Sequence, residues 1–228
     1  MGSAKAIQKP IVIAIDGPAG AGKSTVAKEL ARRLGFTYLD TGAMYRALTL
    51  KAIQQKVNLE DETALVSLAK KTIIEITADD KNTLRVLLDG RDVSEIIRSL
   101  EVTNNTFYIA RTPGVREVMV ERQREIGRTT NVVVEGRDVG TVVFPKATKK
   151  FYLDADFNER SRRRIDELRA KGKNVDEQSL KEDLQERDTK DFTRKAGPLK
   201  KADDAIVIDS THLSIEDVIG KILGFIEQ

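Results

Sequence analysis

A glycine-rich segment near the amino terminus carries the clearest chemical signal in the chain. Residues 17–24 read Gly-Pro-Ala-Gly-Ala-Gly-Lys-Ser, which fits the pattern G-x-x-x-x-G-K-[ST]. Glycines let backbone N–H groups close around phosphate oxygens, and the amino end of a following helix adds partial positive charge. In such loops the lysine neutralises the β- and γ-phosphates, and the hydroxyl helps to hold Mg²⁺. We therefore expect a nucleoside triphosphate here, with Lys23 as a catalytic cation and Ser24 as a metal ligand.

The same loop occurs in several classes of nucleotide-binding protein. Its expected nucleotide contacts are Gly17, Pro18, Ala19, Gly20, Ala21, Gly22, Lys23, Ser24 and Thr25. The chain has neither a guanine-reading N-K-x-D motif nor a D-x-x-G switch after a second strand, which argues against a GTPase. A length of 228 residues argues against a large mechanical ATPase. A kinase of small molecules remains, and it needs a second site for the accepting anion.

Two arginines follow predicted strands, at the position where ligands gather beside an open parallel sheet. Arg46 comes after the strand expected over residues 36–39, and Arg137 with Asp138 comes after the strand expected over 132–134. The planar guanidinium of arginine binds phosphate bidentately and keeps its charge. An arginine beside an aspartate can hold phosphate with one side chain and a base edge or ribose with the other. These residues are our first candidates for an acceptor site.

Two further arginine clusters have an alternative explanation as solvated salt-bridge ladders, which are common on helix surfaces. Arg187, Asp191 and Arg194 are spaced at i, i+4 and i+7, which places them on one face of a helix. A second cluster lies in a highly charged helix expected over residues 158–174. Its members are Arg160, Arg162, Arg163 and Arg164. We expect at least two of these four to act only as surface ion pairs.

The elements that must position these residues alternate between strands and helices. Short apolar runs predict strands over the ranges 11–15, 36–39, 132–134, 151–153 and 205–208. Helical spacing follows the glycine-rich loop over residues 24–34, and Asp40-Thr41 can cap a helix that runs through Leu48. This order predicts an α/β fold with a parallel sheet covered on both faces.

Residues 59–105 break that alternation. Strands expected over 72–77 and 84–88 are joined through a polar turn at 78–82, which predicts an antiparallel pair, and apolar helical stretches lie on either side. We interpret this stretch as a small inserted α+β subdomain.

Composition narrows the possible settings and partners. The chain is 40% hydrophobic and 33% charged, has no cysteine and has a formal charge of only +3. The chain has no cysteine, no apolar signal core, and no apolar run that approaches the roughly 20 residues of a membrane helix. These features favour a cytoplasmic protein that does not bind membranes. Tryptophan is absent and aromatic residues make up 5%, which leaves few platforms for stacking nucleic-acid bases.

Taken together, these motifs resemble those of the bacterial cytidylate kinases, a branch of the nucleoside monophosphate kinases. The similarity runs almost from end to end, and the third of its four signature blocks is the most specific. The blocks are Ile13-Ala14-Ile15-Asp16-Gly17-Pro18, Leu39-Asp40-Thr41-Gly42-Ala43-Met44-Tyr45-Arg46, Glu135-Gly136-Arg137-Asp138-Val139-Gly140-Thr141-Val142-Val143-Phe144-Pro145 and Ala205-Ile206-Val207-Ile208-Asp209-Ser210-Thr211.

The resemblance implies the three-layer α/β/α fold of P-loop NTPases, in which residues 1–58 and 106–228 form the core. It implies a monophosphate-binding insertion at 59–105 and a mobile arginine-bearing lid at 156–174. The implied reaction is Mg²⁺-dependent transfer from ATP to CMP or dCMP, in pyrimidine nucleotide metabolism, by a monomer without a covalent intermediate. The implied catalytic residues are Lys23, Arg137, Arg160 and Arg164. The implied acceptor-site residues are Thr41, Tyr45, Arg46, Arg116, Arg137, Asp138, Arg187, Asp191 and Arg194.

Within that acceptor site we expect a division of labour. Arg46 and Arg137 should lie nearer the phosphate, Asp138 and Arg116 nearer the cytosine, and Arg187 with Asp191 nearer the sugar. Two positions depart from some members of the family. Thr41 replaces a serine and keeps the hydroxyl, whereas Phe107 falls near a serine that touches the nucleotide, which affects the expected sugar preference.

Two alternatives stay open at this point. The first is a kinase of the same fold that acts on UMP, AMP or shikimate. A carboxylate at Asp138 can accept from the amino group of cytosine and would repel the carbonyl of uracil, so this residue distinguishes the two pyrimidines. The second is a nucleotide-dependent regulator that binds nucleic acid, which the absence of a helix-turn-helix, an RNA-binding signature and a polybasic tail disfavours.

Overall fold

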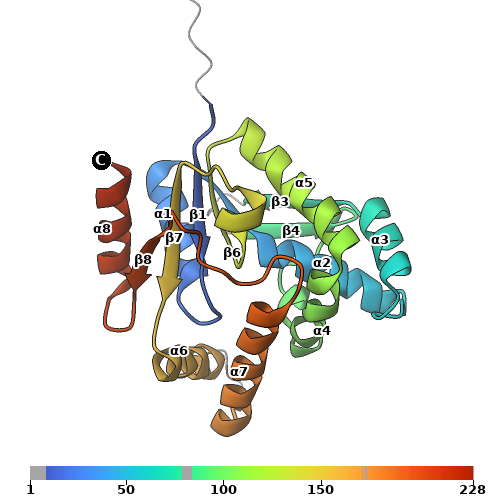
Figure 1. Cartoon of the computed structure of the whole chain (residues 1–228). Coiled ribbons are helices and arrows are strands. Elements are labelled where there is room, and N and C mark those ends of the chain that lie inside the picture. Colours follow the sequence, from blue (N-terminus) through green and yellow to red (C-terminus); the bar gives the residue numbers. More distant parts are fainter. Residues whose placement is uncertain (1–8, 79–83, 171, 173, 228) are drawn as a thin grey trace, which may run out of the picture.

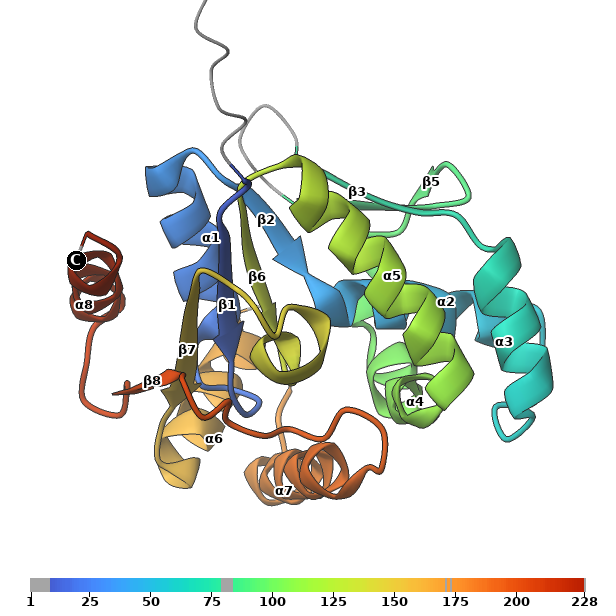
Figure 2. The ribbon, with the colours of Figure 1, turned by 45° about the horizontal axis from the view of Figure 1, so that its top comes forward.

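The computed structural model describes residues 9–78, 84–170, 172 and 174–227. Its centre is a five-stranded parallel sheet with the strand order β2-β6-β1-β7-β8. Helices cover both faces of the sheet (Figures 1 and 2), which confirms the expected α/β fold. The strands are β1 (Val12–Asp16), β2 (Thr37–Asp40), β6 (Val132–Gly136), β7 (Lys149–Asp154) and β8 (Ile206–Asp209).

Alternation along the buried strands explains why there are three layers. Val12 and Ala14 of β1 point into one apolar core, whereas Ile13 and Ile15 point into another on the opposite face. The first core is closed by α2 (Thr41–Gln54) and α5 (Pro113–Thr129), and the second by α1 (Lys23–Leu34) and α8 (Ile215–Ile226). All five residues of β1 are buried, as expected for a central strand of a parallel sheet.

Local signals set the ends of the first two helices. α1 ends at Gly35, whose φ of 66° lies in the left-handed region that favours glycine. α2 begins after Asp40, whose side chain accepts a hydrogen bond from the N–H of Ala43 at 2.9 Å. The predicted cap is therefore confirmed, and it fixes the position of the first turn of α2 beside the end of β2.

The insertion contains an antiparallel sheet with the strand order β3-β4-β5. The β3–β4 pair was predicted, whereas β5 was not. β3 spans Ile74–Ala78 and starts two residues later than expected. The reason is that the hydroxyl and N–H of Thr72 donate to carbonyls in the last turn of α3 (Glu62–Lys71). β4 spans Leu84–Leu88 and β5 spans Arg91–Asp92. Residues 79–82 of the predicted turn lie outside the described part of the chain.

The insertion shares its core with α2. Ala43, Ala47 and Leu50 of that helix pack against Val86 of β4 and Ile97 of η1 (Ile96–Arg98). The expected boundary at residue 105 falls within α4 (Leu100–Arg111), which also packs closely on α2. The insertion therefore packs directly on the helix that carries Arg46.

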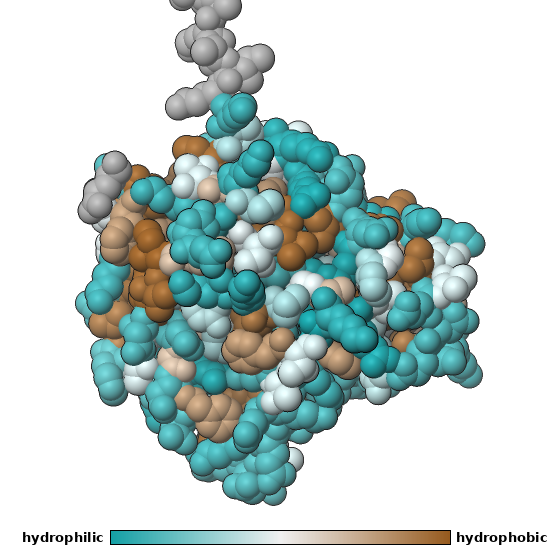
Figure 3. All heavy atoms as spheres, in the orientation of Figure 1, coloured by the Kyte–Doolittle hydropathy of each residue, from teal (hydrophilic) through white to brown (hydrophobic). Residues whose placement is uncertain are grey.

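Three elements complete the fold. A turn of π-helix, η2 (Val139–Val143), follows Asp138, and two charged helices, α6 (Phe157–Ala170) and α7 (Glu177–Thr193), lie below the sheet in Figure 1. The helix predicted over residues 158–174 corresponds to α6, which ends at Ala170. Figure 3 shows a mainly hydrophilic face with scattered apolar patches. Among the described residues, no helix combines the length and apolar character needed to cross a membrane.

Candidate active site

The loops that carry the predicted site residues meet at one edge of the sheet. β2 and β6 are parallel neighbours, and their register aligns Asp40 with Glu135 at the carboxyl ends. Thr41 follows β2 directly, Arg137 follows β6, and the phosphate loop, residues 17–24, follows the adjacent β1. The Thr41 hydroxyl donates to the backbone carbonyl of Glu135 at 2.8 Å and so ties two of these loops together. This is the edge at which open parallel sheets bind ligands.

The phosphate loop depends on its glycines. Gly20 and Gly22 have φ values of 78° and 88°, which L side chains rarely adopt. At Gly17 a Cβ atom would collide with the backbone oxygen of Leu153 on β7. Gly22 is also the residue before α1, so no side chain at that position competes for the N–H groups of the first helical turn. These groups and the helix dipole suit a bound polyphosphate.

Lys23 is buried, with 5% of its surface exposed, and its Nζ donates to the Pro18 carbonyl at 2.5 Å. Burial, with the charges of Arg137 and Arg187, lowers the pKa of Lys23 to about 7, although Glu135 and Asp191 oppose the shift. A desolvated ammonium surrounded by arginines is held at a cost that an anionic ligand would remove. The arrangement therefore favours a phosphate group at this position.

The carboxylate of Glu135 lies beside the first turn of α1. Glu135 accepts a hydrogen bond from the Tyr38 hydroxyl, and its pKa is raised by burial and by the charge of Asp40, while Lys23 and the Ser24 hydroxyl oppose the shift. Ser24 itself is exposed. Hydroxyl and carboxylate oxygens are the donors that hard divalent cations prefer, so this group fits the metal that ATP-dependent kinases need. Within the described ranges, no cluster of three or more His, Cys, Asp or Glu residues forms a complete protein cage for a metal.

Arg46 is held by Asp40, the last residue of β2. Its guanidinium pairs with Asp40 at 2.8 Å, and the two side chains are only 13% and 9% exposed. The Nε of Arg46 is buried without a protein hydrogen-bond partner in the described structure. A buried donor of this kind is costly unless something accepts from it, and a bound anion would do so.

Four arginines lie close together where α7 faces the strand ends. They are Arg46, Arg137, Arg164 and Arg187. Arg137 pairs with Asp191 at 2.8 Å. Arg187 has no hydrogen bond or ion pair with any other described residue. Burial and then the charge of Arg137 lower its pKa to about 10, and the charges of Arg46 and Arg164 add to this effect. Like charges repel, so such a cluster is stable only at a cost that a polyanion would offset.

A second cluster surrounds Asp138. Its carboxylate forms a buried ion pair with Arg116 and a longer contact of 3.4 Å with Arg194. Arg194 also donates to the carbonyl of Gly197 at 2.6 Å, and any side chain at Gly197 would collide with the Arg116–Asp138 pair. Arg116 lies over the ring of Tyr45, 5.7 Å from its centroid. Burial raises the pKa of Asp138 although both arginines oppose the shift.

The arginines of α6 divide into two groups. Arg162 pairs with Glu159 and Asp166, and Arg164 pairs with Glu167, in the surface ladder expected for at least two of them. Arg163 also pairs with Glu159, but its guanidinium donates to the Ser210 carbonyl as well. Arg160 is buried and donates to the carbonyl of Ala19 in the phosphate loop at 2.8 Å. Arg160 and Arg164 are the two arginines of α6 that were predicted to be catalytic. Arg160 contacts the phosphate loop, whereas the side chain of Arg164 is 30% exposed and its charge lowers the pKa of Arg187.

The sequence interpretation missed several acidic residues that position the site. Asp40 and Glu135 are described above, and Asp188 contacts the phosphate loop. Asp16 accepts hydrogen bonds from the N–H groups of Val139 and Gly140 at 2.8 and 2.7 Å, and burial raises its pKa to about 6. Their position in the sequence could have identified three of these four residues. Asp16, Asp40 and Glu135 lie at the end of a strand or one residue before it, where parallel strands present side chains to a ligand.

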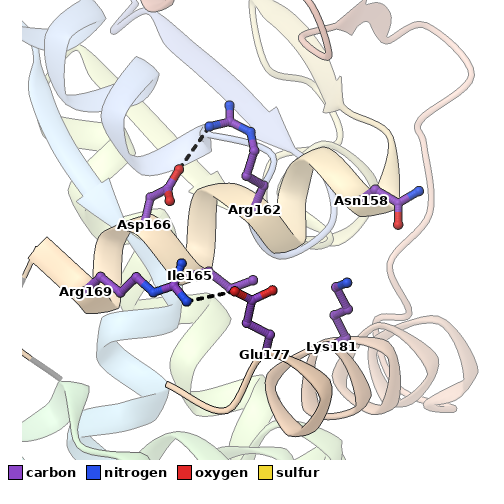
Figure 4. Close-up of a pocket in the computed structure, with 7 residues that line it drawn as sticks. All are labelled: Asn158, Arg162, Ile165, Asp166, Arg169, Glu177 and Lys181. Carbon is purple, nitrogen blue, oxygen red and sulfur yellow. Dashed lines mark hydrogen bonds and ion pairs between the residues drawn. The ribbon is translucent and has the colours of Figure 1, made fainter. Parts of the chain in front are cut away.

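A separate cavity of about 240 Å³ lies between α6 and α7 (Figure 4). It is lined by Asn158, Arg162, Ile165, Asp166, Arg169, Glu177 and Lys181. Its arginines are paired internally, Arg162 with Asp166 at 2.9 Å and Arg169 with Glu177 at 2.7 Å. None of the predicted catalytic or acceptor residues lines this cavity.

Comparison with known proteins agrees with this geometry. A family model described as "Cytidylate kinase" matches residues 13–228. A cytidylate kinase of Desulforamulus reducens is 52% identical over 216 residues, which cover 95% of this chain and 96% of the relative. A cytidylate kinase of a Geobacillus species is 52% identical over 218 residues, which cover 96% and 97%.

Among solved structures, an uncharacterized protein from Eubacterium ventriosum covers 96% of this chain and 99% of its own, with a TM-score of 0.51 and 13% identity. At that identity the likeness supports only the fold. The family model spans a range that contains every predicted site residue, and the two curated relatives cover almost the whole chain. The chain therefore belongs to the cytidylate kinase family.

Proposed function

We propose that the chain transfers the γ-phosphoryl group of ATP to CMP and dCMP, and so forms CDP and dCDP in pyrimidine nucleotide metabolism. Membership of the cytidylate kinase family supports this reaction. The observation that carries it in the structure is the phosphate loop beside a cluster of arginines that is short of counter-charges. Two polyanions must meet there, and cations are what makes that approach possible.

The transfer needs little proton chemistry. A phosphate monoester has a second pKa of about 6, so the acceptor is largely a dianion at neutral pH and needs no general base. Ser24, with the nearby carboxylate of Glu135, would hold Mg²⁺, whose charge would offset that of the phosphates. Lys23 binds the donor phosphates, and Arg137, Arg160 and Arg164 spread the charge that develops on the transferred group. No covalent intermediate is required.

The acceptor site divides along the two clusters described above. Arg46, Arg137 and Arg187 bind the acceptor phosphate, because the charges of Arg137 and Arg187 act on Lys23 and that of Arg46 acts on Arg187. We therefore assign Arg187 to the phosphate and not to the sugar, for which the sequence had suggested it. Asp191 likewise orients Arg137. Asp138 and Arg116 read the cytosine edge, Tyr45 packs beneath Arg116, and Arg194 holds Asp138. Thr41 positions the strand ends.

Closure would exclude water from this site, because an open site that held ATP would hydrolyse it. We assign this role to the insertion, residues 59–105, and to the lid, residues 156–174. We further propose a cytoplasmic monomer whose partners are its nucleotide substrates alone.

Asp138→Asn tests the acceptor assignment. The carboxylate accepts from the amino group of cytosine and repels the carbonyl of uracil, whereas an asparagine amide can turn to face either. We expect the ratio of kcat/KM for CMP to that for UMP to fall by about 10–100-fold, the range expected for the loss of a hydrogen bond to a charged group. Coupled measurement of ADP release gives both constants.

The control is Asp203→Asn, an exposed carboxylate remote from β6 in sequence, which should keep the wild-type ratio. Thermal unfolding of both variants checks that they are folded. An unchanged CMP-to-UMP ratio in folded Asp138→Asn would remove Asp138 from base recognition.

A further inference from the structure

Asp188 is a buried carboxylate of α7 to which the reaction proposed above assigns no role. It is 7% exposed, and its two oxygens face two different partners. Oδ1 accepts from the N–H of Ala19 in the phosphate loop at 3.2 Å, and Oδ2 accepts from the Arg160 guanidinium at 2.6 Å. One carboxylate therefore joins the phosphate loop, α6 and α7.

Arg160 completes this connection. The nitrogen that pairs with Asp188 also donates to the Ala19 carbonyl at 2.8 Å, so both polar groups of the Ala19 backbone are engaged. Its Nε donates to the Ala155 carbonyl at 3.0 Å, which fixes the guanidinium from the other side. At Gly20 a Cβ atom would lie 3.0 Å from the backbone oxygen of Arg160, so loop and helix are already in close contact.

The position of Asp188 on α7 links this network to the acceptor site. Arg187, the preceding residue, lies in the arginine cluster, and Asp191, one helical turn later, pairs with Arg137. A helix moves as a stiff unit over one turn, because its backbone hydrogen bonds are local. An acceptor phosphate that draws Arg187 and Arg137 together therefore also sets the position of the carboxylate that holds the phosphate loop.

We propose that Asp188 is a positioning residue that couples the two substrates. When CMP orders α7, Asp188 holds Ala19 and Arg160 in the arrangement that binds the phosphates of ATP. The acceptor therefore strengthens donor binding, and the donor strengthens acceptor binding by the same factor, as linkage requires. This inference rests on the proposed function, because it takes CMP as the ligand of the arginine cluster.

The test measures the Kd of a non-hydrolysable ATP analogue with Mg²⁺ by calorimetry, with and without saturating CMP. In the wild-type protein CMP should tighten analogue binding by about 5–150-fold, the usual range of such coupling. Asp188→Ala should reduce that ratio to about 1 while the Kd for CMP alone stays within about threefold, since its direct contacts remain. Asp188→Asn, which can still accept from the Ala19 N–H but loses the ion pair, should reduce the ratio at least about threefold.

Asp183→Asn is the matched control, because Asp183 is an exposed carboxylate of the same helix, and it should keep the wild-type ratio. The Asn variant keeps the shape of the side chain and is decisive if the Ala variant does not fold. The proposal is overturned if folded Asp188→Asn keeps the wild-type ratio, or if CMP leaves analogue binding unchanged in the wild-type protein. Turnover of CMP in the same wild-type preparation separates these outcomes from a failure of the proposed function, which would abolish turnover itself.

Discussion

Lys23→Met is expected to lower kcat for phosphoryl transfer by about 1,000-fold. The ammonium of Lys23 is the cation that the phosphate loop presents to the donor, and removing one preorganised charge from a reacting centre costs about 100–1,000-fold or more. Methionine preserves most of the length and the apolar stem of lysine, so the variant isolates the charge. Coupled measurement of ADP release with CMP as acceptor gives kcat directly.

The folded state should tolerate this change well. Burial lowers the pKa of Lys23 to about 7, so its charge is unfavourable in the protein without nucleotide. We therefore expect an unfolding temperature at or above that of the wild type. Lys28→Met is the control, since Lys28 lies on the same helix outside the loop, and it should retain kcat within about twofold. A Lys23→Met protein within tenfold of the wild-type kcat would contradict the role given to this lysine.

Arg187→Met is expected to change stability and activity in opposite directions. Arg187 has no ion-pair partner among the described residues. Burial first, and then the charges of Arg137, Arg46 and Arg164, lower its pKa to about 10, and the charge of Asp191 opposes this shift. Replacing Arg187 removes both the desolvation and the repulsion, so the free energy of unfolding should rise by about 1–2 kcal/mol. The same change should lower kcat/KM for CMP by at least about 100-fold, because a phosphate-binding cation is lost.

Denaturant unfolding and steady-state kinetics on one preparation measure the two effects together. Arg128→Met is the matched control, because Arg128 is 61% exposed and forms only a surface pair with Glu121. It should change stability by less than about 1 kcal/mol and leave the kinetics unaltered. If Arg187→Met is destabilised and fully active, the cluster is structural and does not bind the acceptor phosphate.

The features that the sequence predicts well depend on local patterns. The phosphate loop, the strand β1 before it and the cap at Asp40 are each encoded within about ten residues, so spacing alone locates them. The parallel sheet follows from apolar runs alternating with helices. Strand ends were off by a residue or two where a side chain intervenes, as Thr72 does when it extends the hydrogen bonding of α3.

The features that escaped prediction depend on contacts between distant segments. Asp188 lies in a charged stretch that also reads as a surface ladder, and only the fold brings it to Ala19, 169 positions away. Glu135 and Asp40 acquire their electrostatic environment from burial between neighbouring strands. The resemblance places Arg187 and Arg46 in one acceptor site, but residue spacing does not, because their approach needs α7 to cross the strand ends.

The most direct test of the central claim is acceptor specificity. ADP release from ATP and Mg²⁺ should be measured with CMP, dCMP, UMP, AMP, GMP and shikimate as separate acceptors, beside a control without acceptor. We predict strong turnover with CMP and dCMP and little with the others. Preferred turnover of AMP, GMP or shikimate would contradict the assignment of Asp138 and Arg116 to cytosine, and turnover no greater than the acceptor-free control would contradict the proposed phosphoryl transfer itself.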